Sequence, residues 1–303
     1  MKYFQIKKMF LLVLLCIWPQ SSVTASDVLP VFVSIIPQKY FVEKIGGDFV
    51  NVFVMVEPGA GPATYEPKPR QMTDLNKTEL YFAIGVPFEN VWLKKISAGN
   101  PNMQIIYTQE GIEKLPMASH SHDHEEETHE KEKGHFENDH RIKDPHIWLS
   151  PPLVMIQARN ILTALIDAAP VHKLSFENNY KTFINELIDL DIEMRNMFAE
   201  KRKSSEFMVF HPSWGYFAKA YGLKQIPVEL EGKTPKPAHL QELINQAKAK
   251  KINIIFVQPQ FSSKSAEVIA RAISGRVISL DSLALNWAEN LRNAGLQLKN
   301  SLQ

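Results

Sequence analysis

The sequence predicts an α/β protein of two lobes, each with a mostly parallel sheet, linked by one long rigid helix. Short apolar runs rich in Val, Ile and Phe alternate with helical patterns, as expected for parallel strands that are covered on both faces. These runs form two groups, and the long stretch between the groups repeats apolar residues every three or four positions. The length of 303 residues is sufficient for two such lobes.

Eight apolar runs are expected to be strands, four in each half. Helical patterns at 240–250 and 265–273 separate the later runs, which favours βαβ units. The expected strands are 31–36, 50–56, 80–84 and 104–108 in the first half, and 207–210, 225–230, 252–257 and 276–280 in the second.

The linking helix is expected at about 172–203, where it would be roughly 45 Å long. That length is enough to run along both lobes and fix their separation, although an ordinary long surface helix is the alternative. A preceding helix is expected to begin after Ser150, with Pro151 and Pro152 in its first turn. The apolar face of the linking helix consists of Tyr180, Phe183, Leu187, Leu190, Met194 and Phe198.

The two halves share a weak sequence pattern, in which Tyr-Phe precedes Gly by the same number of residues. This pattern is consistent with a duplicated α/β unit and also with chance use of a helix-ending glycine. The matched residues are Ile36-Pro37, Tyr40-Phe41 and Gly46 in the first half, and His211-Pro212, Tyr216-Phe217 and Gly222 in the second.

Residues 1–25 have the pattern of a secretory signal peptide, with three lysines before the apolar run 9–18 and Val23-Thr24-Ala25 at the cleavage site. The run is too short to span a bilayer comfortably, so an uncleaved anchor is the weaker interpretation. We therefore expect a periplasmic protein.

The single cysteine, Cys16, lies inside this signal. Lipid attachment would require a small residue before it, and Leu15 is not small, so a soluble exported protein is favoured over a lipoprotein. The mature chain then has neither a disulfide nor a thiolate ligand.

The formal charge of +1, from 34 basic and 33 acidic residues, excludes a broad basic surface for nucleic acid.

The segment 119–140 contains six of the ten histidines and eight acids, and it has no apolar periodicity. Neutral imidazole is a strong ligand for zinc, copper and nickel, so this segment indicates a loop with many weak, exchangeable metal sites. The alternatives are a solvated charged loop and a pH-sensing loop.

Two histidines and one aspartate outside that segment are candidate metal ligands. His211 and Asp281 follow expected strands, and ligands in α/β sheets gather at the carboxyl ends of strands. His146 follows Asp144-Pro145 on a turn that enters an apolar segment. His172 and His239 lie at helix starts and are expected to be structural.

The chain resembles the metal-binding solute-binding proteins of zinc and manganese ABC importers. The resemblance implies two α/β lobes, a rigid linking helix, a metal bound between the lobes, and an acidic, histidine-rich loop in zinc-preferring members. The matching stretches are Tyr65-Glu66-Pro67-Lys68-Pro69, Asp144-Pro145-His146-Ile147-Trp148-Leu149-Ser150-Pro151, Phe210-His211-Pro212-Ser213-Trp214-Gly215-Tyr216-Phe217, Glu231-Gly232-Lys233 and Leu280-Asp281-Ser282-Leu283-Ala284.

The resemblance implies that His146, His211 and Asp281 are metal ligands. The family's first histidine would stand at Ala63, which cannot bind metal. Three interpretations remain: a water molecule completes a three-ligand site, Glu66 or a loop histidine fills the gap, or the site is weakened or takes another ligand. Loss of one neutral nitrogen weakens zinc binding relative to a four-ligand site.

The leading hypothesis is a monomeric periplasmic zinc receptor that delivers its ion to the membrane permease of an ABC importer and catalyses no reaction. A manganese-preferring member of the same family is one alternative, because removing a histidine makes the ligand set harder. An exported zinc-dependent hydrolase is another, although the chain lacks His-Glu-x-x-His and Gly-x-Ser-x-Gly. Acylation of Cys16 would favour an adhesion or scaffolding role.

The expected organisation has four parts: a signal peptide at 1–25, an N-terminal lobe at 26–170 that includes the loop 119–140, a linking helix at 171–204, and a C-terminal lobe at 205–303.

Overall fold

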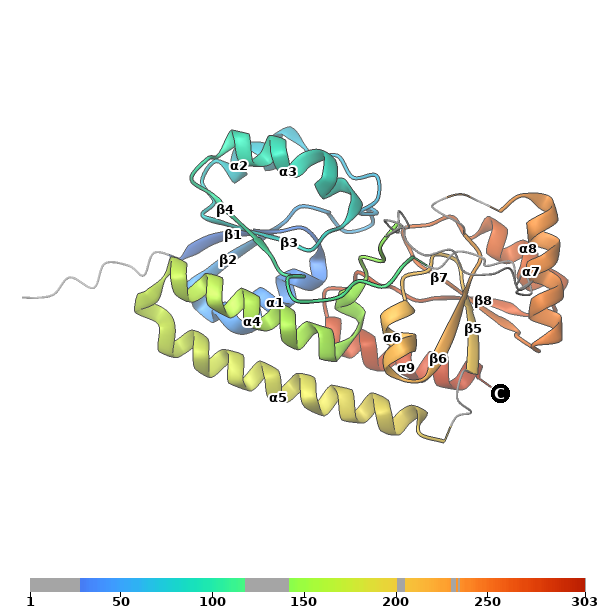
Figure 1. The fold of residues 1–303 in the computed structure, drawn as a ribbon. Helices are drawn as coiled ribbons and strands as arrows, with labels where there is room; N and C mark the ends of the chain where they lie inside the picture. Colours follow the sequence, from blue (N-terminus) through green and yellow to red (C-terminus); the bar gives the residue numbers. More distant parts are fainter. Residues whose placement is uncertain (1–27, 118–141, 201–204, 230–232, 234, 303) are drawn as a thin grey trace, which may run out of the picture.

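The computed structural model describes residues 28–117, 142–200, 205–229, 233 and 235–302. Two sheets with their helices form two lobes, and one long helix runs beneath both (Figure 1). The predicted fold class is confirmed. The predicted signal peptide 1–25 and the histidine-rich segment 119–140 lie outside the described residues, and the predicted limits of the lobes stay predictions.

The first lobe is a four-stranded parallel sheet with the order β2-β1-β3-β4. Helices α1 and α4 cover one face and α2 and α3 the other (Figure 1). The strands are β1 Leu29–Val33, β2 Val50–Val54, β3 Leu80–Ala83 and β4 Gln104–Tyr107, and the helices are α1 Ile36–Gly46, α2 Pro69–Leu75, α3 Pro87–Gly99 and α4 Pro151–Ala168.

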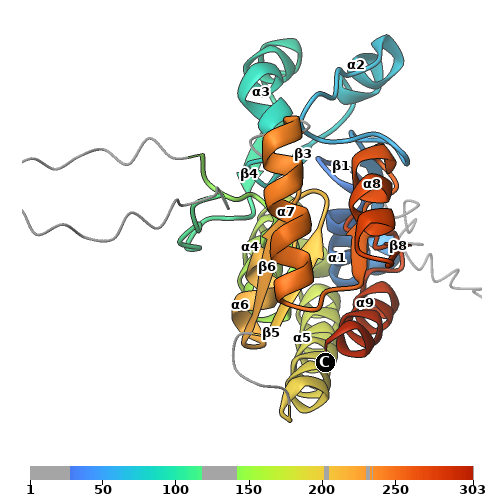
Figure 2. The same cartoon turned by 90° about the vertical axis from the view of Figure 1, so that its right-hand side faces the viewer.

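The second lobe repeats this arrangement with the order β6-β5-β7-β8, again all parallel. Helices α7 and α8 form its outer layer, as seen from the end of the molecule (Figure 2). The strands are β5 Ser205–Val209, β6 Leu223–Pro227, β7 Ile254–Val257 and β8 Arg276–Ser279, and the helices are α6 Gly215–Ala220, α7 Pro237–Ala249, α8 Lys264–Ala272 and α9 Trp287–Ser301.

All eight predicted strands are therefore confirmed, with ends that differ by up to three residues. The helix expected after Ser150 is also present, with Pro151 and Pro152 in its first turn. Ser150 is the N-cap residue of this helix, although its side chain makes no capping hydrogen bond.

The matching strand orders allow the two lobes to be compared residue by residue. Ser34 donates its N–H to β3 as Phe210 donates its N–H to β7, so these two residues are equivalent. His211 is then equivalent to Ile35. The sequence pairing of Ile36-Pro37 with His211-Pro212 was therefore wrong by one residue.

The linking helix α5 spans Lys173–Phe198, 26 residues or about 39 Å. The predicted helix extended to 203, whereas α5 ends at Phe198. Its predicted apolar face is buried apart from the partly buried Tyr180. Phe183 packs on Phe41 of the first lobe and Phe198 on Phe217 of the second, with ring centroids 6.0 and 5.9 Å apart. The surface-helix alternative is excluded because this face contacts both lobes.

The two lobes share one apolar core, which extends from β1 through α5 to α9. Two buried tryptophans hold the junction: Trp148 donates its indole N–H to the carbonyl of Ser282 (2.7 Å), and Trp287 donates to the carbonyl of Trp148 (2.8 Å). A smaller, separate core lies beneath α7 and α8. None of the helices in the described part of the chain combines the length and apolar character needed to cross a bilayer.

Candidate metal centre

The segment that carries His146 is anchored on the first lobe. Asp144 donates its backbone N–H to the carbonyl of Leu115 (2.8 Å), and the 3-10 helix Ile147–Leu149 that follows is buried. The Asp144 carboxylate accepts the backbone N–H of His146 (2.9 Å) and lies 2.7 Å from its ring Nδ1. His146 is 4% exposed, and burial lowers the pKa of its imidazole, which favours the neutral, metal-binding form. The predicted turn into an apolar segment is confirmed.

Tyr216 of the second lobe ties this segment across the junction. Its hydroxyl donates to the carbonyl of Asp144 (2.9 Å) and accepts the backbone N–H of Leu115 (2.9 Å). The neighbouring Gly215 allows the close approach, since a Cβ there would stand 2.9 Å from the Asp144 carboxylate. The position of His146 therefore depends on both lobes.

His211 follows β5 and is held by residues that follow two other strands of the second sheet, β6 and β7. It lies two residues beyond β5, and Gln258 after β7 binds both its backbone N–H (3.2 Å) and its carbonyl (2.8 Å). Its ring Nδ1 lies 3.2 and 3.3 Å from the two carboxylate oxygens of the buried Glu229, which follows β6. The ring stacks on Phe261 at 4.6 Å.

The two imidazoles meet across the junction, with their Nε2 atoms 3.2 Å apart. Two nitrogens bound to one tetrahedral zinc at 2.0–2.1 Å are separated by about 3.3 Å. Asp144 and Glu229 favour protons on both Nδ1 atoms, which leaves the lone pair of each Nε2 available to a metal ion. A cation between them removes the repulsion between these lone pairs. The geometry thus fits a site in which two imidazole nitrogens bind one ion.

Asp281 lies two residues beyond β8 and is firmly held. Its Oδ1 accepts hydrogen bonds from Gln260 Nε2 (3.1 Å) and from the backbone N–H of Leu283 (2.9 Å). The side-chain amide of Asn290 donates to its carbonyl (2.7 Å). The predicted position of Asp281 after a strand is confirmed.

Asp281 belongs to the same junction as the histidine pair, because its neighbour Ser282 accepts the indole N–H of Trp148, two residues after His146. Among the described residues, no three His, Cys, Asp or Glu side chains are arranged to hold one ion. The structure therefore brings His146 and His211 together, and the ligand role of Asp281 stays a prediction.

The loop between β2 and α2 contains Ala63, where the family resemblance places a histidine. Ala63 and Glu66 are both exposed, whereas Tyr65 between them is buried and donates its hydroxyl to Gln71 (2.8 Å). The candidate loop histidines belong to 119–140, outside the described residues. The group that completes the site also stays a prediction.

Sequence reasoning missed the residues that orient the histidines. Asp144 was named only for its place in a turn and in a matching stretch, and Glu229 was given no role. The rule about carboxyl ends could not identify Glu229 from the sequence, because the expected strand 225–230 included this residue, whereas β6 ends at Pro227. Gln258 gave no signal either, because an amide side chain is not a typical zinc ligand.

The other two described histidines are where the sequence placed them, at helix starts. His172 precedes α5 and stacks on Phe49 at 4.0 Å. His239 lies in the first turn of α7, with its Nδ1 3.3 Å from Glu242.

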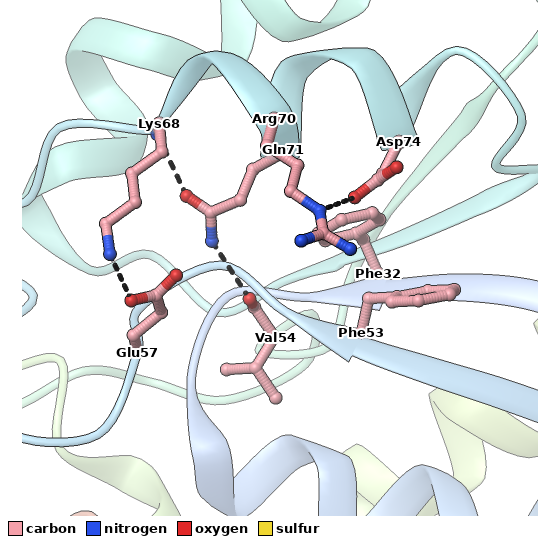
Figure 3. A pocket seen from close by; sticks show the side chains of 8 residues that line it. All are labelled: Phe32, Phe53, Val54, Glu57, Lys68, Arg70, Gln71 and Asp74. Atoms are coloured by element: carbon pink, nitrogen blue, oxygen red, sulfur yellow. Dashed lines mark hydrogen bonds and ion pairs between the residues drawn. The ribbon is translucent and has the colours of Figure 1, made fainter.

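A pocket of about 380 Å³ opens beside α2, on the first lobe (Figure 3). Its charged groups already have partners, because Lys68 pairs with Glu57 and Arg70 with Asp74. The Gln71 amide donates to the carbonyl of Val54 (3.2 Å). None of the proposed ligands lines this pocket, so it is separate from the histidine pair.

A family model described as the zinc-uptake complex component A, periplasmic, matches residues 31–299. The high-affinity zinc uptake system protein ZnuA of Bacillus subtilis is 30% identical over 289 residues, which cover 92% of this chain and 87% of that protein. The manganese ABC transporter substrate-binding lipoprotein ScaA of Streptococcus gordonii is 26% identical and covers 76% of this chain and 71% of its own length.

Solved structures give the same result. A crystal structure of ZnuA is 41% identical and superposes with a TM-score of 0.83, over 91% of this chain and all of that chain. A ZnuA deletion mutant with zinc bound is 40% identical, with a TM-score of 0.81, over 91% of this chain and 99% of its own.

Proposed function

The chain belongs to the family of periplasmic zinc-uptake components, and we propose that it captures one zinc ion between His146 and His211 for import through an ABC transporter. It is the solute-binding component of such a system, as its relatives are. Their names describe zinc uptake in some members and manganese transport in another, and zinc agrees best with this chain.

The observation that carries this proposal is the pair of facing Nε2 atoms, 3.2 Å apart, each on a ring whose Nδ1 faces a buried carboxylate. This arrangement fixes the tautomer that binds metal and places both lone pairs before any ion arrives. Two nitrogen donors suit zinc better than manganese, which prefers oxygen.

Asp281 is the proposed third ligand. It follows β8 in the second lobe and provides a carboxylate from the same junction. Water, Glu66 or a histidine of 119–140 completes the set in place of Ala63. A site with fewer protein nitrogens than four-ligand relatives holds zinc less tightly and releases it more readily.

The chain acts as a binding protein and catalyses no reaction on its cargo. Its proposed partner is the membrane permease, which receives the ion from the junction of the lobes. We place the mature protein in the periplasm as a monomer, after removal of residues 1–25.

Zinc retention by the mature chain, residues 26–303, tests this proposal. A variant lacking 119–140 should hold one zinc ion per chain in equilibrium dialysis at micromolar free metal, because the loop sites are then gone. His211→Ala in that variant should abolish retention, whereas the control His239→Ala should not. Manganese dialysed in the same way should be held more weakly.

Two results would contradict the proposal. Zinc binding that disappears with the loop, and that His211→Ala does not weaken in the mature chain that keeps the loop, would show that the histidine pair is no site. Retention that survives His211→Ala would place the ion elsewhere in the chain.

A further inference from the structure

The segment 258–261, directly after β7, touches both proposed ligands of the second lobe. Gln258 binds the backbone of His211 on both sides, and Phe261 stacks on the His211 ring. Gln260, between them, reaches Asp281 instead. One short segment therefore sets the relative placement of His211 and Asp281.

The amide of Gln260 uses only part of its hydrogen-bonding capacity within the described residues. Its Nε2 donates to Asp281 Oδ1 (3.1 Å), while its Oε1 is buried and has no hydrogen-bond partner among the described residues. A buried amide oxygen without a donor is costly, so such a group calls for an explanation. Within the described chain, the one side-chain hydrogen bond this amide makes serves Asp281.

This bond decides which oxygen of Asp281 remains available. Oδ1 accepts from both Gln260 and the backbone of Leu283, and no donor in the described part of the chain reaches Oδ2. The same principle holds for the histidines, whose Nδ1 atoms face carboxylates while their Nε2 atoms face each other. In each case the non-binding atom is held and the other atom is left to the ion.

We propose that Gln260 is a positioning residue for zinc, which orients Asp281 so that Oδ2 binds the ion. This inference rests on the proposed function and on Asp281 as third ligand. Partners that orient a metal ligand typically contribute 10–100-fold in metal affinity. Gln260 is only half-buried and on a loop, which makes a folding role for its amide small.

The test is Gln260→Met, which keeps the length of the side chain and removes the donor. We expect zinc affinity of the chain without residues 1–25, measured by competition with a chromophoric chelator, to fall roughly 10–100-fold. The matched control is Gln241→Met, on α7, where the exposed glutamine donates to Asn245. Cobalt(II) bound in place of zinc should show changed visible absorption in Gln260→Met and not in the control.

A double-mutant cycle separates orientation from a general structural effect. In an Asp281→Ala background, Gln260→Met should cause no further loss, because its target is gone. Unchanged zinc affinity in Gln260→Met, or an equal loss in both backgrounds, would overturn the inference. A wild-type chain that binds zinc while Asp281→Ala binds equally well would overturn it too, and would leave the histidine pair standing. Failure of the wild type to bind zinc would instead overturn the proposed function.

Discussion

The two lobes have the same backbone plan and opposite chemistry at the carboxyl ends of their strands. Both sheets have the same strand order, and their backbone hydrogen bonds place the residues after each strand in register. The first lobe has apolar or neutral residues where the second has proposed ligands and the residues that contact them. The equivalent pairs are Ile35 and His211, Val56 and Glu229, Ile84 and Gln258, and Gln109 and Asp281.

The lobes also differ in what a buried glutamine contacts, Gln38 in the first lobe and Gln258 in the second. In the first lobe, Gln38 seals the strand ends: its amide oxygen accepts the N–H of Ile35 (3.3 Å), and its nitrogen donates to Thr108 (3.1 Å). In the second lobe, Gln258 holds the backbone of His211. The same fold thus carries different side chains at the strand ends of its two lobes, and side chains at a few such positions decide function.

Substitutions at the equivalent residues His211 and Ile35 test the difference between the lobes most directly. His211→Ala removes a proposed ligand. The binding free energy of a four-ligand zinc site is about 10–16 kcal/mol, so loss of one ligand costs about 3–4 kcal/mol. Zinc affinity should therefore fall roughly 100- to 1,000-fold. Ile35→Val should leave zinc affinity unchanged and cost about 1 kcal/mol of unfolding free energy. Chelator competition and urea denaturation measure the two effects. A comparable loss of affinity in Ile35→Val would contradict the division between the lobes.

The next effect concerns stability alone. Gln38→Ala leaves the buried N–H of Ile35 without an acceptor and opens a cavity, so we expect it to lower the free energy of unfolding by about 3 kcal/mol. Zinc affinity of the folded protein should stay within twofold of wild type. Urea denaturation without metal measures the first quantity, and zinc titration below the unfolding transition measures the second. A loss of affinity without a loss of stability would assign Gln38 to the ion site.

A substitution of Glu229 tests whether this residue orients His211 in the second lobe. Glu229→Gln keeps an acceptor near His211 Nδ1 but removes the carboxylate that orients the ring, so zinc affinity should fall roughly tenfold. Glu57→Gln is the control, since this acid pairs with the exposed Lys68 and contributes at most about 1 kcal/mol to stability. Isothermal titration with zinc distinguishes the two variants. Equal affinities would mean that Glu229 does not orient the ligand.

Much of this molecule could be predicted from the sequence. The β-rich runs and the apolar face of α5 are local patterns, because parallel strands and a helix packed on two lobes repeat their burial in sequence. His211 and Asp281 were found because both follow strands, where an α/β sheet collects its ligands.

The orienting contacts could not be predicted in the same way. Asp144 reaches His146 through a turn whose side-chain direction no periodicity encodes, and Tyr216 meets Asp144 from 72 residues away. Such contacts depend on how two lobes meet, which is set by the shared core. The composition of the fourth ligand position is open for the same reason, since Ala63 shows what is missing without showing what replaces it.

The smallest expected effect is that of a substitution that makes the lobes more alike. It gives the first lobe a histidine at position 63, where the family resemblance places one. Ala63→His adds a nitrogen worth about 3 kcal/mol, but ordering the exposed loop costs about 2 kcal/mol, so zinc affinity should rise only about fivefold. Thr64→His, on the adjacent exposed residue, should have no effect in the same chelator competition. Unchanged or weaker binding in Ala63→His would mean that another group already holds that position. In that case Glu66→Gln or deletion of 119–140 should weaken zinc in the wild type, since one of them would remove the group in question.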